Sequence, residues 1–210
     1  MVTTIRRLTD SCLTVTTDGG TTLFDPGFHT FDSGKVDLES VGEVQQVLIT
    51  HEHGDHVEPE FVRWLIDRGA DLRVHSNQSV ARMLEPHGIE VTTANPSQVT
   101  SEDVVHEMTP MGSAPPNRSY TLEGIFTHPG DSYQPSATAP VLALPLVTLW
   151  GSTTASVDFA QRLGPQQVVP VHDWYVDASG RQWVYDLVGD TLARHGIEFV
   201  PLDWGESYSL

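Results

Sequence analysis

The segment 51–56, which reads His-Glu-His-Gly-Asp-His, constrains this chain more than any other part of its sequence. It follows a short apolar run at 46–50 that is typical of a buried strand. Imidazole nitrogen and carboxylate oxygen are the ligands that borderline divalent metals such as zinc prefer. Because residues two apart point to the same side of an extended chain, His51 and His53 can bind one ion. The aspartate and histidine that end the segment can turn towards a second ion about 3.5–4 Å away.

The charge balance narrows the class of partner. The chain has 28 acidic and 11 basic residues, a formal net charge of −17. Such a chain lacks the basic surface that binds long nucleic acids by counterion release, so we expect a small-molecule substrate and no nucleic acid. Two bound divalent ions would add four positive charges locally, which keeps a small phosphorylated substrate among the candidates.

Length and cysteine content indicate the domain organisation and the compartment. A chain of 210 residues fits one domain, 1–210, with a substantial core. Its single cysteine, Cys12, excludes an internal disulfide, which fits the reducing cytoplasm. No apolar stretch is as long as a membrane helix, and no apolar block typical of a signal peptide follows the N-terminus. The oligomeric state is left open.

The pattern of apolar residues and turn signals predicts two similar halves. Each half has β-rich segments followed by alternating strands and helices, which favours mixed sheets backed by helices. Packed face to face, they form a four-layer αβ/βα sandwich with the helices outside. The predicted strands are 4–7, 13–17, 21–24, 46–50, 72–75, 89–92, several within 102–128, 141–144, 167–171 and 198–201. The predicted helices are 59–66, 78–84, 154–163 and 183–195, and 26–45 is predicted to be a surface loop.

Four segments together resemble the motifs of the metallo-β-lactamase fold, a superfamily of metal-dependent hydrolases. The first is 51–56, which resembles its signature H-x-H-x-D-H. An early strand ending in Asp-Pro-Gly, at 22–27, resembles another of its motifs. The Gly-Asp pair within 128–132 and the strand ending in a histidine at 169–173 follow in the order of that family. The resemblance implies the same sandwich fold.

The resemblance also implies a ligand set for two divalent metal ions, zinc or else manganese or iron. In that pattern a first metal is held by His51, His53 and His106, a second metal is held by Asp55, His56 and His172, and Asp131 bridges them. His106 is the member that the pattern supports least. Many relatives have this histidine in the following loop, which here is 108–112 and contains none. Strand alternation alternatively turns His106 into the core or out to solvent.

Other residues have supporting roles in this interpretation. Asp25 is expected to accept the second ring N–H of a ligand histidine, which fixes its tautomer, or to serve only as the first residue of an Asp-Pro-Gly turn. Asn117, Arg118 and Tyr120 precede Asp131 and are candidate donors to a substrate oxygen or leaving group.

The predicted activity is hydrolysis of a small ester, lactone, thioester or phosphoester by a metal-activated hydroxide, with Asp55 orienting the nucleophile and accepting its proton. Among the families that share the motifs, the short chain resembles the cytoplasmic ascorbate-6-phosphate lactonase group. Class B β-lactamases use a late cysteine ligand, which is missing here. Flavodiiron relatives differ in their first motif and have a flavin domain. A single-metal or degenerate member that only binds metal or ligand, and a phosphodiesterase or nuclease-type relative, remain as alternatives.

Overall fold

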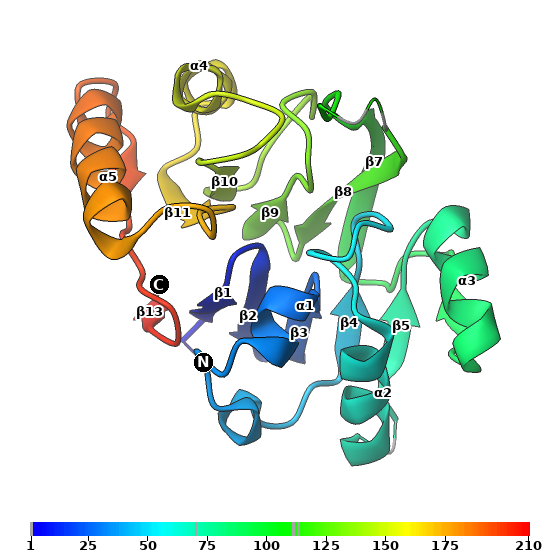
Figure 1. The fold of residues 1–210 in the computed structure, drawn as a ribbon. Coiled ribbons are helices and arrows are strands. Elements are labelled where there is room, and N and C mark those ends of the chain that lie inside the picture. Colours follow the sequence, from blue (N-terminus) through cyan, green and yellow to red (C-terminus); the bar gives the residue numbers. More distant parts are fainter. Residues whose placement is uncertain (1, 70, 111, 113) are drawn as a thin grey trace. The chain divides into compact units, whose positions relative to one another are not determined.

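The computed structural model of the chain describes residues 2–69, 71–110, 112 and 114–210 (Figure 1). Met111, in the loop that lacks a histidine, lies outside the described residues. The chain divides into two compact units: Met1–Pro96 together with Leu202–Leu210, and Ser97–Pro201. Among the described residues, no helix combines the length and the hydropathy that crossing a bilayer requires. Whether the two units form the single domain predicted stays a prediction.

The first unit is built on a seven-stranded mixed sheet with the order β13-β1-β2-β3-β4-β5-β6. Strands β13, β1, β2 and β3 pair antiparallel, and β3 to β6 pair parallel. The turn between β2 and β3 ends at Gly20, whose φ of 112° lies in the region that favours glycine. The strands are Thr4–Thr9 (β1), Cys12–Thr17 (β2), Gly20–Phe24 (β3), Gln46–Leu48 (β4), Arg73–His75 (β5), Val91–Thr92 (β6) and Ser207–Ser209 (β13).

Helices α2 (Pro59–Arg68) and α3 (Gln78–Leu84) of this unit have side-chain caps. Helix α2 begins with a proline, and the side chain of Glu58 accepts a hydrogen bond from the Glu60 backbone N–H. The Asn77 side chain caps α3 in the same way. The ring of Phe61 on α2 stacks on Phe31, with 5.4 Å between the centroids, within the core of the unit. The helices are α1 (Phe28–Asp32), η1 (Leu38–Val41), α2 (Pro59–Arg68), α3 (Gln78–Leu84) and η2 (Glu85–His87).

The second unit repeats the scheme with a six-stranded sheet in the order β12-β11-β10-β9-β8-β7. Strands β7, β8 and β9 pair antiparallel, and β9 to β12 pair parallel. The strands are Val99–Val105 (β7), Pro116–Leu122 (β8), Phe126–His128 (β9), Val141–Pro145 (β10), Gln167–Val171 (β11) and Glu198–Phe199 (β12).

Two helices pack on the parallel strands of the second unit. Helix α4 (Thr153–Leu163) contacts β10, and α5 (Ala178–Ala193) contacts β12 and α4. The Ser152 side chain caps the first turn of α4, and Gly164 ends that helix in the left-handed conformation. Buried residues from α4, α5 and the strands form one core, which includes Leu142, Phe159 and Val188.

The predicted fold class, two mixed sheets with helices, is confirmed. Helix α3 and strand β11 match their predicted ranges residue for residue. The surface loop predicted at 26–45 is wrong in part, because it contains α1, η1 and the buried Val36, Val41 and Val44. Helix α5 begins at Ala178 rather than Trp183 because Asp177 caps it. Strand β13 was not predicted.

The turn after β3 lies directly against the loop after β4. Phe28 N–H donates to the Gly54 carbonyl at 2.9 Å, and Glu58 N–H donates to the Pro26 carbonyl at 2.8 Å. Between these two bonds there is no room for a side chain at Gly27, since a Cβ there would lie 1.8 Å from the carbonyl oxygen of Asp55.

We therefore expect Gly27→Ala to lower the free energy of unfolding by about 2 kcal/mol or more, because one backbone segment must move away from the other. Urea denaturation measures the change. Gly189→Ala is the matched control, since its Cβ meets only Phe199 at 3.6 Å and alanine favours the helix. Equal stability of the two variants would mean that the contact relaxes without cost.

Candidate metal centre

In the first unit, the candidate residues follow two neighbouring parallel strands. Phe24 of β3 pairs with Leu48 of β4, so both strands end at the same edge of the sheet. Asp25 N–H donates to the Leu48 carbonyl at 3.0 Å, which extends this pairing by one residue. The chain after β4 therefore runs alongside Asp25, where loop residues of α/β sheets commonly form sites.

The carboxylate of Asp25 is fully buried and organises this loop. One oxygen accepts the Thr50 backbone N–H at 2.7 Å. The other accepts the Thr50 hydroxyl at 2.8 Å and lies 2.7 Å from His56 Nδ1. Because a carboxylate only accepts hydrogen bonds, Nδ1 carries the proton and Nε2 presents its lone pair for a metal. Asp25 thus contacts a ring nitrogen of the candidate ligand His56, and it directly follows β3 with a positive φ of 47°.

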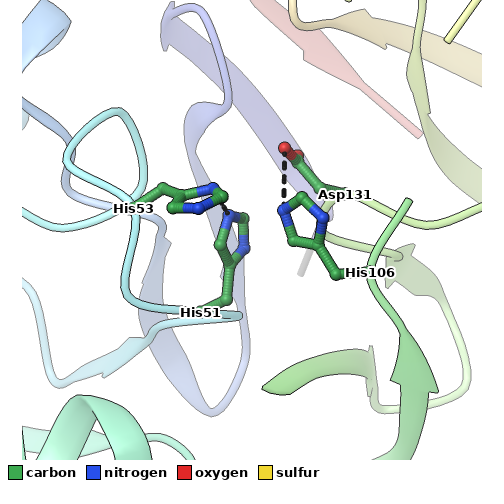
Figure 2. Close-up of side chains that lie close together, drawn as sticks. All are labelled: His51, His53, His106 and Asp131. Atoms are coloured by element: carbon green, nitrogen blue, oxygen red, sulfur yellow. Dashed lines mark hydrogen bonds and ion pairs between the residues drawn. The ribbon is translucent and has the colours of Figure 1, made fainter. Parts of the chain in front are cut away.

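His51 and His53 lie side by side in the same unit (Figure 2). Nε2 of His51 is 3.1 Å from Nδ1 of His53, and the rings meet edge to face. Two nitrogens that bind zinc tetrahedrally at about 2.0–2.1 Å lie roughly 3.3 Å apart. The pair therefore fits a shared ion, as its spacing predicted.

The two carboxylates of the segment, Asp55 and Glu52, turn in different directions. The Asp55 side chain is 18% exposed, and its Oδ2 lies 3.9 Å from Nε2 of the buried His56. Glu52 faces away, and its carboxylate accepts a hydrogen bond from the Ser79 hydroxyl on α3. The Asn77 amide holds the Thr50 carbonyl at 3.2 Å. The segment is thus fixed by hydrogen bonds on both sides.

In the second unit, a buried aspartate occupies the turn after β9. The Asp131 backbone N–H donates to Asn117 Oδ1 at 3.3 Å. Nδ2 of the same Asn117 side chain donates to the Pro129 carbonyl at 2.9 Å. The Asp131 carbonyl accepts the Glu107 N–H at 2.8 Å, which ties the turn to the chain after β7. Asp131 is 1% exposed, so these bonds fix a carboxylate inside the protein.

Each oxygen of the Asp131 carboxylate meets one histidine of the same unit. Oδ2 lies 3.4 Å from Nε2 of His106, and Oδ1 lies 2.6 Å from Nε2 of His172. Figure 2 shows the first of these contacts. His106 Nδ1 donates to the Glu107 carbonyl, which leaves Nε2 for the carboxylate side. A carboxylate with one oxygen towards each of two imidazoles suits a bridge between two ions.

His172 is held in a strained conformation. It directly follows β11 and has a φ of 58°, which an ordinary side chain adopts only when its surroundings enforce it. Its carbonyl accepts the Val147 N–H at 2.8 Å, which links it to the chain after β10. Strain of this kind costs about 1–3 kcal/mol and clusters at functional sites.

The predicted substrate residues lie on β8. Both polar atoms of the Asn117 side chain are used in the Asp131 turn, as described above. Tyr120 is fully buried, and Arg118 donates from Nε to Asp103 at 2.7 Å. Their contact with a substrate stays a prediction.

Some residues near these clusters were missed in the sequence. Thr50 was assigned only to a strand, although its hydroxyl joins Asp25 and lies 3.2 Å from His56 Nδ1. Trp150 packs against His172 and His106, with ring centroids 5.8 and 6.3 Å apart. No local pattern marks either residue. Cys12 is excluded as a nucleophile because burial raises the pKa of its thiol far above neutral.

The comparisons with known proteins identify the family of the chain. A family profile described as the beta-lactamase superfamily domain matches residues 4–172. Protein Rv0786c of Mycobacterium tuberculosis is 27% identical over 190 residues, which cover 83% of this chain and 86% of that protein.

Two solved structures share the fold at low identity. Igni18, a metallo hydrolase from the archaeon Ignicoccus hospitalis, has a TM-score of 0.74 and 16% identity over 100% of this chain and 99% of its own. The metallo-β-lactamase fold protein YhfI from Bacillus subtilis has a TM-score of 0.69 and 12% identity over the whole of both chains. The chain therefore belongs to the metallo-β-lactamase superfamily of metal-dependent hydrolases.

We expect Asp25→Asn to weaken metal binding by about 10- to 100-fold, as loss of a carboxylate behind a ligand histidine typically does. The new NH₂ group would oppose the Nδ1 proton of His56 and favour the wrong tautomer. Chelator competition measures the affinity. Asp18→Asn, in the exposed turn before β3, is the control and should bind metal normally. If both variants bound metal with unchanged affinity, Asp25 would serve only as a residue of the Asp-Pro-Gly turn.

Proposed function

We propose that this protein is a binuclear metal-dependent hydrolase of a small ester, lactone, thioester or phosphoester. The observation that carries the proposal is the Asp131 carboxylate, whose two oxygens each meet one histidine. The second support is the motif of the first unit, where the nitrogens of His51 and His53 lie at a spacing that suits one ion.

The proposed ligand set divides between two ions as the sequence predicted. The first ion would be held by His51, His53 and His106, the second by Asp55, His56 and His172, with Asp131 shared. Histidine nitrogen and carboxylate oxygen suit zinc, and the same set accepts manganese or iron. When bound, such ions lower the pKa of water to about 7 and polarise the oxygen of the scissile group.

The roles of the chain's own residues follow from their surroundings. Asp25 and the Glu107 carbonyl hold the ligand histidines in the tautomer that binds metal. Asp55 is the proposed proton acceptor, because its carboxylate is partly exposed whereas the imidazoles of His51 and His56 are buried. The net charge of −17 favours a small uncharged or weakly anionic substrate over a polyanion.

The direct test is a hydrolysis screen on protein whose zinc, manganese and iron contents are known. We expect close to two ions per chain and turnover of at least one chromogenic ester, lactone or phosphodiester. Asp55→Ala and His172→Ala should lower the rate by about 100-fold or more, since they remove a proton acceptor and a ligand.

The matched controls for this screen are His87→Ala and His195→Ala. Both histidines are exposed and lie at helix ends away from the motifs, so activity should stay near that of the unchanged protein. Only trace metal after reconstitution, or equal losses in all four variants, would contradict the proposed function.

His106→Ala tests the ligand with the least support in the sequence. Its contact with Asp131 leads us to expect that bound metal falls from about two ions per chain towards one. Elemental analysis after dialysis measures this. If both metal content and activity survive, His106 is a packing residue and the first ion has another ligand.

A further inference from the structure

The proposed function gives no role to the indole of Trp150, which packs against the second-unit candidate ligands His106 and His172. Trp150 lies in the loop between β10 and α4, and its ring meets His172 nearly edge to face, at an interplanar angle of 79°. It also packs against Tyr133, with ring centroids 5.0 Å apart. Two candidate ligands and one tyrosine thus surround a single tryptophan.

The indole nitrogen of Trp150 is buried and has no hydrogen-bond partner among the described residues. A tryptophan N–H can only donate, and a buried donor without an acceptor is costly enough that native proteins rarely tolerate it. Its neighbours are aromatic rings, so the local dielectric is low and a hydrogen bond formed there is strong.

The loop that carries Trp150 is fixed at both ends. Leu146 and Val147 donate their backbone N–H groups to the carbonyls of Val171 and His172, at 3.0 and 2.8 Å. At the other end, a Cβ on Gly151 would lie 2.4 Å from the Tyr133 hydroxyl, so the loop packs as closely as glycine allows. The loop that carries the indole is therefore bonded directly to the backbone of His172 and of the residue before it.

Exposed apolar side chains neighbour Trp150 and His106 in the sequence. Leu149, directly before Trp150, is 61% exposed, and Met108, two residues after His106, is 63% exposed. The Tyr133 hydroxyl is already bonded to Ser156 at 3.0 Å, and burial raises the pKa of this phenol, so it stays protonated. Of the Tyr133 and Trp150 side chains, Trp150 is the one whose buried donor has no hydrogen-bond partner among the described residues.

We propose that the Trp150 indole N–H donates a hydrogen bond to the substrate oxygen that gains negative charge during hydrolysis, and to the matching oxygen of an anionic product. This inference rests on the proposed function and adds a substrate-contacting residue to it. A fixed donor in a water-poor environment costs no reorganisation when charge develops, which is why such donors favour the transition state over the bound substrate.

The test uses zinc-loaded, ¹⁵N-labelled protein and inorganic phosphate as the anionic probe. The chain has five tryptophans, and Trp150→Phe assigns one indole N–H signal by its disappearance. Trp183, which is 67% exposed on α5, is assigned in the same way by Trp183→Phe. We expect phosphate to move the Trp150 signal downfield and to leave the Trp183 signal in place.

Trp150→Phe keeps an aromatic ring at this position and removes the N–H donor together with the second ring of the indole. We expect its metal content to equal that of the unchanged protein, its phosphate affinity to fall about tenfold, and kcat for the best ester of the screen to fall about 100-fold with a smaller change in KM. Trp183→Phe should change none of these. If Trp150 only packed, its replacement would alter the melting temperature but would not lower kcat more than it changes KM.

Two results would overturn the inference while the proposed function stands. One is a Trp150 signal that does not move although the zinc-loaded protein hydrolyses ester, and the other is an unchanged kcat in Trp150→Phe. A protein that binds no metal and hydrolyses none of the substrates overturns the proposed function, and the role of Trp150 with it.

Discussion

The buried carboxylate of Asp25 is the interaction on which the first unit's motif depends. It accepts hydrogen bonds from the backbone and hydroxyl of Thr50 and from His56, so one side chain fixes both the end of β4 and a ligand tautomer. A buried carboxylate must be matched by donors, and the donors described above come from Thr50 and from His56 of the segment 51–56. The Asp25 carboxylate therefore both fixes the start of the loop at Thr50 and sets the tautomer of His56.

In the second unit, a side-chain amide rather than a carboxylate fixes the turn that carries the candidate ligand. Asn117 holds the backbone of the Asp131 turn, and the Asp131 carboxylate in turn meets His106 and His172. Asp25 and His172 both follow a strand directly, and both have positive φ. Each unit thus accepts backbone strain at the residue where the chain leaves the sheet, which is where a side chain must turn towards the site.

Family membership defines the type of chemistry but not the substrate, because one fold supports many reactions. This chain combines a highly acidic composition with aromatic rings beside the second-unit candidate ligands. The composition is the basis for proposing a small substrate rather than a long polyanion. Trp150, which packs against two of these candidate ligands, is the residue proposed above to contact the substrate.

The sequence by itself determined the parts of the protein that follow from local pattern. Helix α3, strand β11 and the ligand types in 51–56 are set by periodicity, caps and spacing within a few residues. Tertiary structure alone decided that β13 joins β1, that 26–45 buries three valines, and that Trp150 lies against His172. These features depend on contacts between segments far apart in the chain, whose free energy has no signature in the neighbouring residues.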